Sequence, residues 1–153
     1  IICLMLINRH TNRENTPVFR FAHRAGNLSN FSFDWGREIN DDNAEVWRLS
    51  VASNKHTIAY ISFTIDSDFI FINLMERENA RQSAMFDNIG ATLISFACLR
   101  SLEEGFGGVV AFTAKNRLLN WYQQEFNAQR IGNSNRMVIL ENEATILINY
   151  YLS

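Results

Sequence analysis

The residues best suited to chemistry are Asn88-Ile89-Gly90-Ala91, where a polar stretch gives way to a long apolar run. Apolar residues recur from Ile89 onwards at helical spacing, so a helix should begin here. The first turn of a helix has unpaired backbone N–H groups and a partial positive charge, and both attract anions such as phosphate. The small side chains of Gly90 and Ala91 would let a phosphate reach this backbone. Gly90 has a second interpretation, in which it only lets the helix pack closely on a strand.

Two predicted strands would hold this helix in place. Residues 69–75 are a short run of strand-forming residues before the polar stretch, and residues 109–113 are a continuous apolar run after the helix. Gly105 stands where the helix would need a left-handed C-terminal cap. The order strand, helix, strand predicts a parallel pair joined by a right-handed crossover. The helix N-terminus would then lie beside the carboxyl end of the first strand, where open α/β sheets bind ligands.

This order of elements, together with the loop sequence, resembles the coenzyme-binding core of the GNAT superfamily of N-acetyltransferases over residues 46–141. In that family a loop of pattern Gln/Arg-x-x-Gly-x-Gly/Ala holds the pyrophosphate of acetyl-CoA, and the pattern falls here on residues 85–90. Gly90 matches its last position, whereas Met85 and Asn88 depart from its first and fourth. The resemblance implies a single α/β domain with a mixed central sheet flanked by helices. It also implies acetyl-CoA as cosubstrate, bound by Leu74, Met75, Asn88, Ile89, Gly90, Ala91 and Thr92.

A second match lies at residues 116–128, which resemble the helix that ends in the family's Tyr-x-x-x-Gly-Phe signature. Tyr122 falls on the tyrosine. Phe126 and Asn127 stand near the expected Gly-Phe. The end of this helix could therefore differ from the family signature by one residue in register. A second interpretation of Tyr122 is packing on an amphipathic helix, with only its hydroxyl at the surface.

The chemistry that the resemblance implies is direct transfer of an acetyl group from acetyl-CoA to an unidentified amine, on a small molecule or a peptide. The amine must lose a proton, and the departing thiolate must gain one. Glu76, at the carboxyl end of the first predicted strand, is the expected base, and Tyr122 is the expected acid. Glu78 is an alternative base, and a purely solvated role for Glu76 is also open.

The alternative function is a non-catalytic GNAT-fold interaction module with impaired coenzyme binding. Met85 offers no basic or amide group to a phosphate, and Asn88 adopts a left-handed backbone less easily than glycine. Titration with acetyl-CoA would separate the two functions, because an active transferase must bind it. Other enzyme classes lack their motifs, since the sequence has no Gly-x-Ser-x-Gly elbow, no Gly-x-x-x-x-Gly-Lys-Ser/Thr loop and no two-glycine dinucleotide fingerprint.

Composition supports one ordinary domain, because the chain has 153 residues, of which 47% are hydrophobic and 20% charged. Its net charge is −2, although residues 1–37 carry five arginines against two acidic residues. We expect this arginine-rich part to be a solvated segment, without nucleic-acid binding. The two cysteines lie far apart and the three histidines have no metal-site spacing, so we expect no disulfide, no metal and a reducing cytoplasm.

The remaining core elements fit the same fold. Residues 45–51 and 57–65 predict a hairpin that continues into the strand at residue 69, which makes a three-stranded meander. Residues 31–35 alternate like a short edge strand. In the family, the region before residue 46 supplies the first strand and two helices that line the acceptor cleft. Residues 129–132 and 136–140 predict two further short strands around a turn.

The two ends of the chain are less defined by the sequence. The first residue is Ile1 rather than methionine, so the N-terminal part, residues 1–45, is open to being incomplete. Its apolar run at residues 1–7 suits a first strand or an incomplete helix and is too short to span a membrane. Residues 142–153 add a C-terminal helix to the usual family ending. This helix could meet a partner such as a second copy of the chain, although we expect it to cover the core.

Overall fold

A computed structural model describes residues 6–9, 11, 14–80 and 84–152. The strands are β1 (Leu6–Asn8), β2 (Glu14–Asn15), β3 (Pro17–Phe21), β4 (Glu45–Val51), β5 (Asn54–Ile65), β6 (Ile70–Arg77), β7 (Phe86–Asp87), β8 (Val110–Thr113), β9 (Gln129–Arg130) and β10 (Arg136–Ile139). The helices are α1 (Trp35–Ile39), α3 (Ile89–Glu103), α4 (Leu119–Phe126) and α5 (Glu141–Leu152), with a short 3-10 helix η1 (Asn116–Leu118) before α4.

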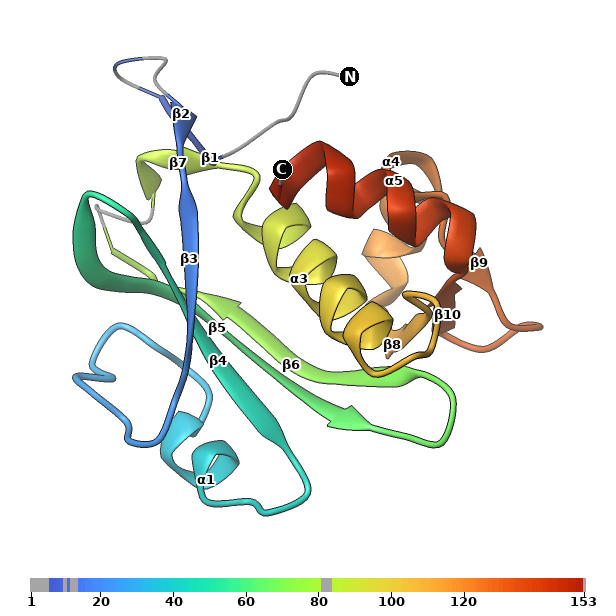
Figure 1. Ribbon diagram of the computed structural model, residues 1–153, viewed down its shortest axis with the longest axis horizontal. Coiled ribbons are helices and arrows are strands. Elements are labelled where there is room, and N and C mark those ends of the chain that lie inside the picture. The colour runs from blue at the N-terminus through green and yellow to red at the C-terminus, as the bar shows by residue number, and fades with distance from the viewer. Residues whose placement is uncertain (1–5, 10, 12–13, 81–83, 153) are drawn as a thin grey trace.

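The main sheet has seven strands in the order β3-β4-β5-β6-β8-β10-β9, and all neighbours are antiparallel except β6 and β8 (Figure 1). The predicted meander is confirmed as β4, β5 and β6. The predicted crossover is confirmed as β6, α3 and β8. Gly105, just after α3, has φ of +87°, which is the left-handed cap that the sequence predicts.

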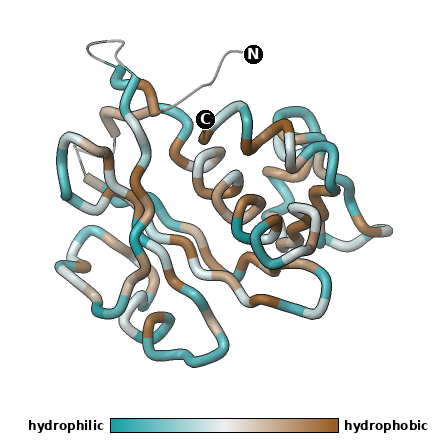
Figure 2. Tube along the Cα trace, viewed as in Figure 1, coloured by the Kyte–Doolittle hydropathy of each residue, from teal (hydrophilic) through white to brown (hydrophobic). Residues whose placement is uncertain are grey.

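The main core lies between one face of the sheet and helices α3, α4 and α5. Strands β8 and β10 place alternate side chains on this face, because successive residues of a strand point to opposite sides. These inward residues belong to one buried cluster with the helices and include Val110, Phe112, Met137 and Ile139. The apolar stretches in Figure 2 run along α3 and the strands next to it. The helical layer therefore packs on this one face of β8 and β10.

The predicted C-terminal helix is confirmed as α5, and its role in covering the core is confirmed as well. Ala144 and Leu147 are buried against the main cluster, whereas Ile146 on the opposite side is 60% exposed. Helix α5 begins beside the glycine turn that ends α3 and runs back along α3 (Figure 1). A Cβ on Gly108 would lie 2.8 Å from the Ala144 Cβ, so only glycine fits this close approach.

A second, smaller core lies on the opposite face of the sheet. Trp35 of α1 stacks on Tyr60 of β5, with 5.2 Å between ring centroids, and Val46 of β4 completes the buried group with Ala22. The prediction of an edge strand at residues 31–35 is wrong. Asp34 instead begins α1 by accepting a hydrogen bond from the Arg37 N–H. Of the alternating aromatic residues, Phe31 and Trp35 pack in the second core, whereas Phe33 is 43% exposed.

The N-terminal part also differs from the prediction. In place of a strand and two helices, the described part contains β3, a single five-residue helix and the β1–β2 hairpin. Strand β1 pairs with β7, in the loop before α3, and forms a small separate sheet with it (Figure 1). Most of the predicted N-terminal strand at residues 1–7 lies outside the described residues, and Leu6–Asn8 is a strand.

Candidate active site

Strands β6 and β8 separate immediately after they meet, and this separation defines the candidate site. They pair only through Ile70 with Val110 and Phe71 with Ala111. Strand β6 continues for six more residues to Arg77, and within the described residues that edge has no further strand partner. A gap between two parallel strands therefore opens toward their carboxyl ends, beside the N-terminus of α3. Unpaired strand edges offer backbone N–H and C=O groups to an extended ligand.

Strand β6 has a bulge at the start of this gap. Ser62 of β5 pairs with Leu74, whereas the next residue, Phe63, pairs with Ile72, so Asn73 is the extra residue. A bulge bends a strand, increases its twist and re-aims its backbone groups. Here the extra residue lies two positions beyond Phe71, the last residue of β6 that pairs with β8. Leu74 and Met75, which the sequence predicts as coenzyme contacts, lie in the part of β6 that borders the gap.

The first turn of α3 has the features that the sequence predicts for a phosphate site. Asn88 has φ of +69°, a left-handed backbone, and its side chain forms no cap. The first N–H groups of the helix, on Ile89, Gly90 and Ala91, consequently have no partner from within the helix. A Cβ built on Gly90 meets no atom within 4 Å. The packing interpretation of Gly90 is therefore wrong, and the space over the helix N-terminus is open.

Thr92 differs from the other predicted phosphate contacts. Its N–H donates to the Asn88 carbonyl oxygen at 2.9 Å, and its hydroxyl donates to the same oxygen at 2.7 Å. The Thr92 side chain is also fully buried. Both donors of Thr92 are used inside the first turn of the helix, so neither is available to a coenzyme phosphate in this arrangement.

Tyr122 lies on α4 next to the carboxyl end of β8. Its ring centroid is 4.8 Å from that of Phe112, and the residue is 8% exposed. Burial raises the pKa of the Tyr122 phenol. The hydroxyl forms no hydrogen bond within the described part of the chain, where no fully buried side-chain oxygen or nitrogen lacks a partner. The hydroxyl is therefore accessible, although the ring is part of the core.

The register of this helix differs from the family signature by one residue. Asn127 ends α4 with a left-handed backbone, φ +50°, and it follows Tyr122 by five residues. In the family signature the left-handed glycine follows the tyrosine by four residues. The exposed Gln123 stands at that distance here. Tyr122 nevertheless packs its ring against Phe112, the residue that follows the last pair between β6 and β8.

Glu76 holds the segment before α1 onto the sheet. Its carboxylate accepts hydrogen bonds from the Ser32 N–H at 2.7 Å, the Phe33 N–H at 3.1 Å and the Trp35 indole N–H at 2.9 Å. Burial alone would raise the pKa of Glu76, but these three donors outweigh it and hold the pKa below its ordinary value. A carboxylate stabilised in this way is a weaker base.

Glu78, the alternative base, is a buried partner of His56. Its carboxylate oxygens lie 2.8 and 2.9 Å from His56 Nε2, and its side chain is 4% exposed. This contact joins the residue that follows β6 to the start of β5. Glu78 is therefore already engaged by a side chain at the edge of the sheet.

One element of the site was missed by sequence reasoning. The loop before α3 is a strand, β7, and β1 pairs with it through Ile7 opposite Asp87 and Asn8 opposite Phe86. Arg9, which follows β1, forms an ion pair with Asp87. The only signal in the sequence was the excess of arginine in residues 1–37, which gave no indication of where those arginines would lie.

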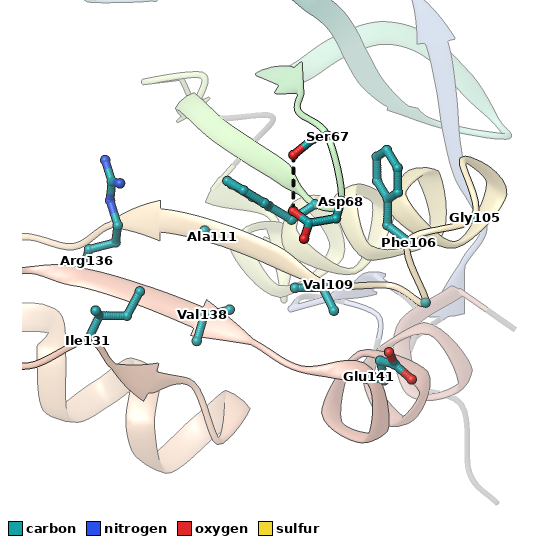
Figure 3. Close-up of a pocket in the computed structure, with 12 residues that line it drawn as sticks. Ser67, Asp68, Gly105, Phe106, Val109, Ala111, Ile131, Arg136, Val138 and Glu141 are labelled. Atoms are coloured by element: carbon teal, nitrogen blue, oxygen red, sulfur yellow. Dashed lines mark hydrogen bonds between the residues drawn. The ribbon is translucent and has the colours of Figure 1, made fainter.

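A cavity of about 800 Å³ lies elsewhere, on the sheet face opposite the helices (Figure 3). Its lining includes the turn before β6 and the turn after α3, with Asp68, Phe106 and Val109 among the residues drawn. Arg136 stands at its other end, with its guanidinium 5.0 Å from the Phe71 ring centroid. The cavity does not include the first turn of α3 or Tyr122.

Within the described part of the chain, no helix is long and apolar enough to cross a membrane. Nor does any group of three or more His, Cys, Asp or Glu side chains in those residues have the arrangement of a metal site.

These features define a class of protein. It is a mixed α/β domain in which two parallel strands separate toward their carboxyl ends, beside the helical layer. No family model matches the chain, and no curated protein matches it in sequence. Solved structures do match. An AtaT mutant toxin bound to the C-terminus of the antitoxin AtaR and acetyl-CoA has a TM-score of 0.61 at 12% identity, over 87% of this chain and 98% of that one.

Two other structures agree. The KacTA–DNA complex has a TM-score of 0.55 at 11% identity, over 86% of this chain and 98% of that one. A chimera of the spermidine N-acetyltransferase SpeG from Vibrio cholerae and hSSAT has a TM-score of 0.56 at 13% identity, over 86% and 99%. The chain therefore has the GNAT fold, and the resemblance expected from the sequence is confirmed at the level of the fold.

Proposed function

We propose that this protein is an acetyl-CoA-dependent N-acetyltransferase. The observation that carries the proposal is the gap between β6 and β8 beside the open first turn of α3. One end of the gap could hold a diphosphate and the other an extended amide chain, and acetyl-CoA contains both groups. The acetyl-CoA named with the AtaT neighbour agrees with this choice of ligand.

The residues present fit the coenzyme. Its diphosphate would lie at the N–H groups of Ile89, Gly90 and Ala91, in the space that a side chain on Gly90 would fill. Its amide chain would pair with the free edge of β6 near Leu74 and Met75. When bound, the coenzyme supplies the thioester whose acetyl group is transferred.

The proposed reaction is attack of a neutral amine on the thioester carbonyl carbon. The N–C bond forms, the C–S bond breaks, and the amine loses one proton. Backbone N–H groups re-aimed by the bulge at Asn73 would stabilise negative charge on the carbonyl oxygen. Tyr122 is our proposed acid, because its accessible hydroxyl lies beside the carboxyl end of β8 and could give a proton to the departing thiolate.

Glu76 takes a different role in this proposal from the one that the sequence predicts. Its three hydrogen-bond donors come from the segment that follows the N-terminal strand of the main sheet. We assign Glu76 the positioning of that segment, on the sheet face opposite α3, and we assign water the removal of the amine proton. The acceptor amine would approach from that face. It is carried by a small molecule or a peptide, and the reducing cytoplasm expected from the cysteines fits the free, buried Cys98.

The test is turnover with acetyl-CoA and a panel of amines, namely polyamines, amino acids and peptide N-termini. Mass spectrometry of the amines and a colorimetric assay of released thiol would be read together. Acetylation of at least one amine with matching thiol release supports the proposal. A protein that binds acetyl-CoA but acetylates no member of the panel favours the interaction module.

A further inference from the structure

The coenzyme loop lacks a cation at the position where the family has one. The first residue of the pattern is Met85, and its side chain packs against the main core cluster. This partly buried, apolar side chain offers no positive charge to a phosphate. If this loop binds a diphosphate, which carries two negative charges, the balancing positive side chain must come from another segment.

The N-terminal hairpin brings such a side chain to the loop. The Arg9 N–H donates to the Met85 carbonyl oxygen at 2.8 Å, directly after the two residue pairs between β1 and β7. The Arg9 guanidinium forms an ion pair with Asp87, the residue before the left-handed Asn88. Both side chains are about half exposed, at 53% and 46%. Arg9 is therefore fixed at its backbone, while its guanidinium can move to a ligand in solvent.

A second guanidinium lies close to this pair. Arg77 is the last residue of β6, at the carboxyl end of the strand that borders the gap. Burial lowers the pKa of Arg77, the charge of Arg9 lowers it further, and the charge of Asp87 raises it. Arg77 is thus near enough to interact with both. Both guanidinium groups therefore lie near Asp87, in the loop that leads into the first turn of α3.

We propose that Arg9, delivered by the β1–β7 pairing, is the residue that contacts the coenzyme diphosphate in place of the missing basic residue at position 85. Arg77 adds to the positive field, and Asp87 holds Arg9 in place until the diphosphate displaces it. Arginine suits this task because its planar guanidinium can donate two parallel hydrogen bonds to phosphate oxygens. The inference rests on the proposed function and adds to it the residue that neutralises the diphosphate.

A purely structural role of the ion pair predicts different behaviour. If Arg9 and Asp87 only fix the hairpin to the loop, removing either side chain loosens the loop and weakens coenzyme binding. If Arg9 binds the diphosphate, the two substitutions act in opposite directions. Arg9→Gln removes the contact, whereas Asp87→Asn frees Arg9 and removes a carboxylate that repels the phosphates.

The experiment is calorimetric titration of acetyl-CoA into the wild type, Arg9→Gln, Asp87→Asn and the double variant. We expect Arg9→Gln to weaken affinity by about tenfold or more, the range of a charge-assisted hydrogen bond. Asp87→Asn should strengthen affinity in the wild-type background and have a smaller effect beside Arg9→Gln. Arg24→Gln is the matched control, because it removes the same charge from an exposed arginine in the loop after β3. We expect it to leave the affinity for acetyl-CoA unchanged.

A second titration uses 3′-dephospho-acetyl-CoA, which keeps the diphosphate. The loss caused by Arg9→Gln should be equally large with this ligand. A loss that disappears would show that Arg9 contacts the 3′-phosphate and would overturn the assignment. Weakening by both single substitutions would also overturn it, in favour of the structural role. If the wild type binds acetyl-CoA and Arg9→Gln binds equally well, the inference fails and the proposed function stands. If the wild type does not bind, both fail.

Discussion

Replacement of Glu76 by glutamine separates the positioning role of this residue from the role of a catalytic base. The substitution keeps the size of the side chain and removes the charge. Glutamine has one carbonyl oxygen, so it can accept at most two of the three hydrogen bonds that reach the Glu76 carboxylate, and its amide group would face a donor. The segment before α1 would then be held less firmly on the sheet.

The expected magnitude follows from these hydrogen bonds. A hydrogen bond to a charged group contributes about 1.5 to 3 kcal/mol, and we expect the free energy of unfolding to fall by about that amount in Glu76→Gln. For a domain of this size the melting temperature should fall by about 3 to 12 °C. Glu14→Gln is the control, because Glu14 is exposed in the short strand β2 and should leave the melting temperature unchanged.

The effect should depend on pH in a definite direction. Because the folded state lowers the pKa of Glu76 below 4.5, the carboxylate adds stability above the unfolded-state pKa and loses it as the pH falls through the folded-state pKa. The stability difference between wild type and Glu76→Gln should be full at neutral pH and shrink on acidification below about pH 4. Thermal unfolding by circular dichroism at several pH values measures it. Unchanged stability at neutral pH, with turnover reduced 100-fold or more as for a lost general base, would refute the positioning role.

Three further predictions concern the site. Tyr122→Phe removes only the proton donor, so turnover should fall by about 100-fold or more with acetyl-CoA affinity and melting temperature preserved, and a loss below about tenfold would exclude the acid role. Asn88→Gly should change acetyl-CoA affinity by less than about threefold, because Asn88 already has a left-handed backbone, and a large gain on titration would show that the loop is strained. Met85→Arg should lower the melting temperature without raising acetyl-CoA affinity, because its side chain packs against the core, and a tenfold gain would show that position 85 faces the coenzyme.

The central part of the fold could be predicted because its signals are local. The apolar runs at β6 and β8, the helical stripe of α3 and the cap at Gly105 each specify one element. Their order then fixes the crossover, since parallel strands joined by a helix have one handedness. The sequence also placed Gly90 in the first turn of α3, where the structure shows that a Cβ would meet no atom within 4 Å.

The N-terminal region could not be predicted because its structure depends on distant contacts. Strand β1 lies between β2 and β7 in its sheet, and β7 comes about eighty residues later in the chain. The aromatic residues around Trp35 alternate as in a strand, yet Phe31 and Trp35 pack on Tyr60 from a loop and a short helix. The hydrogen bonds of Glu76 reach the same region. The sequence placed Glu76 only at the end of a predicted strand. Its positioning role could therefore not be predicted.

The central claim is that the first turn of α3 binds the diphosphate of acetyl-CoA, and one comparison tests it directly. Wild type and Gly90→Val would be titrated with acetyl-CoA by calorimetry, with thermal unfolding of both in the absence of ligand. We predict that the wild type binds one acetyl-CoA and that Gly90→Val binds none, while both unfold at similar temperatures because a Cβ at this position meets no atom within 4 Å. A folded Gly90→Val protein with wild-type affinity would contradict the claim, as would a wild type that does not bind acetyl-CoA.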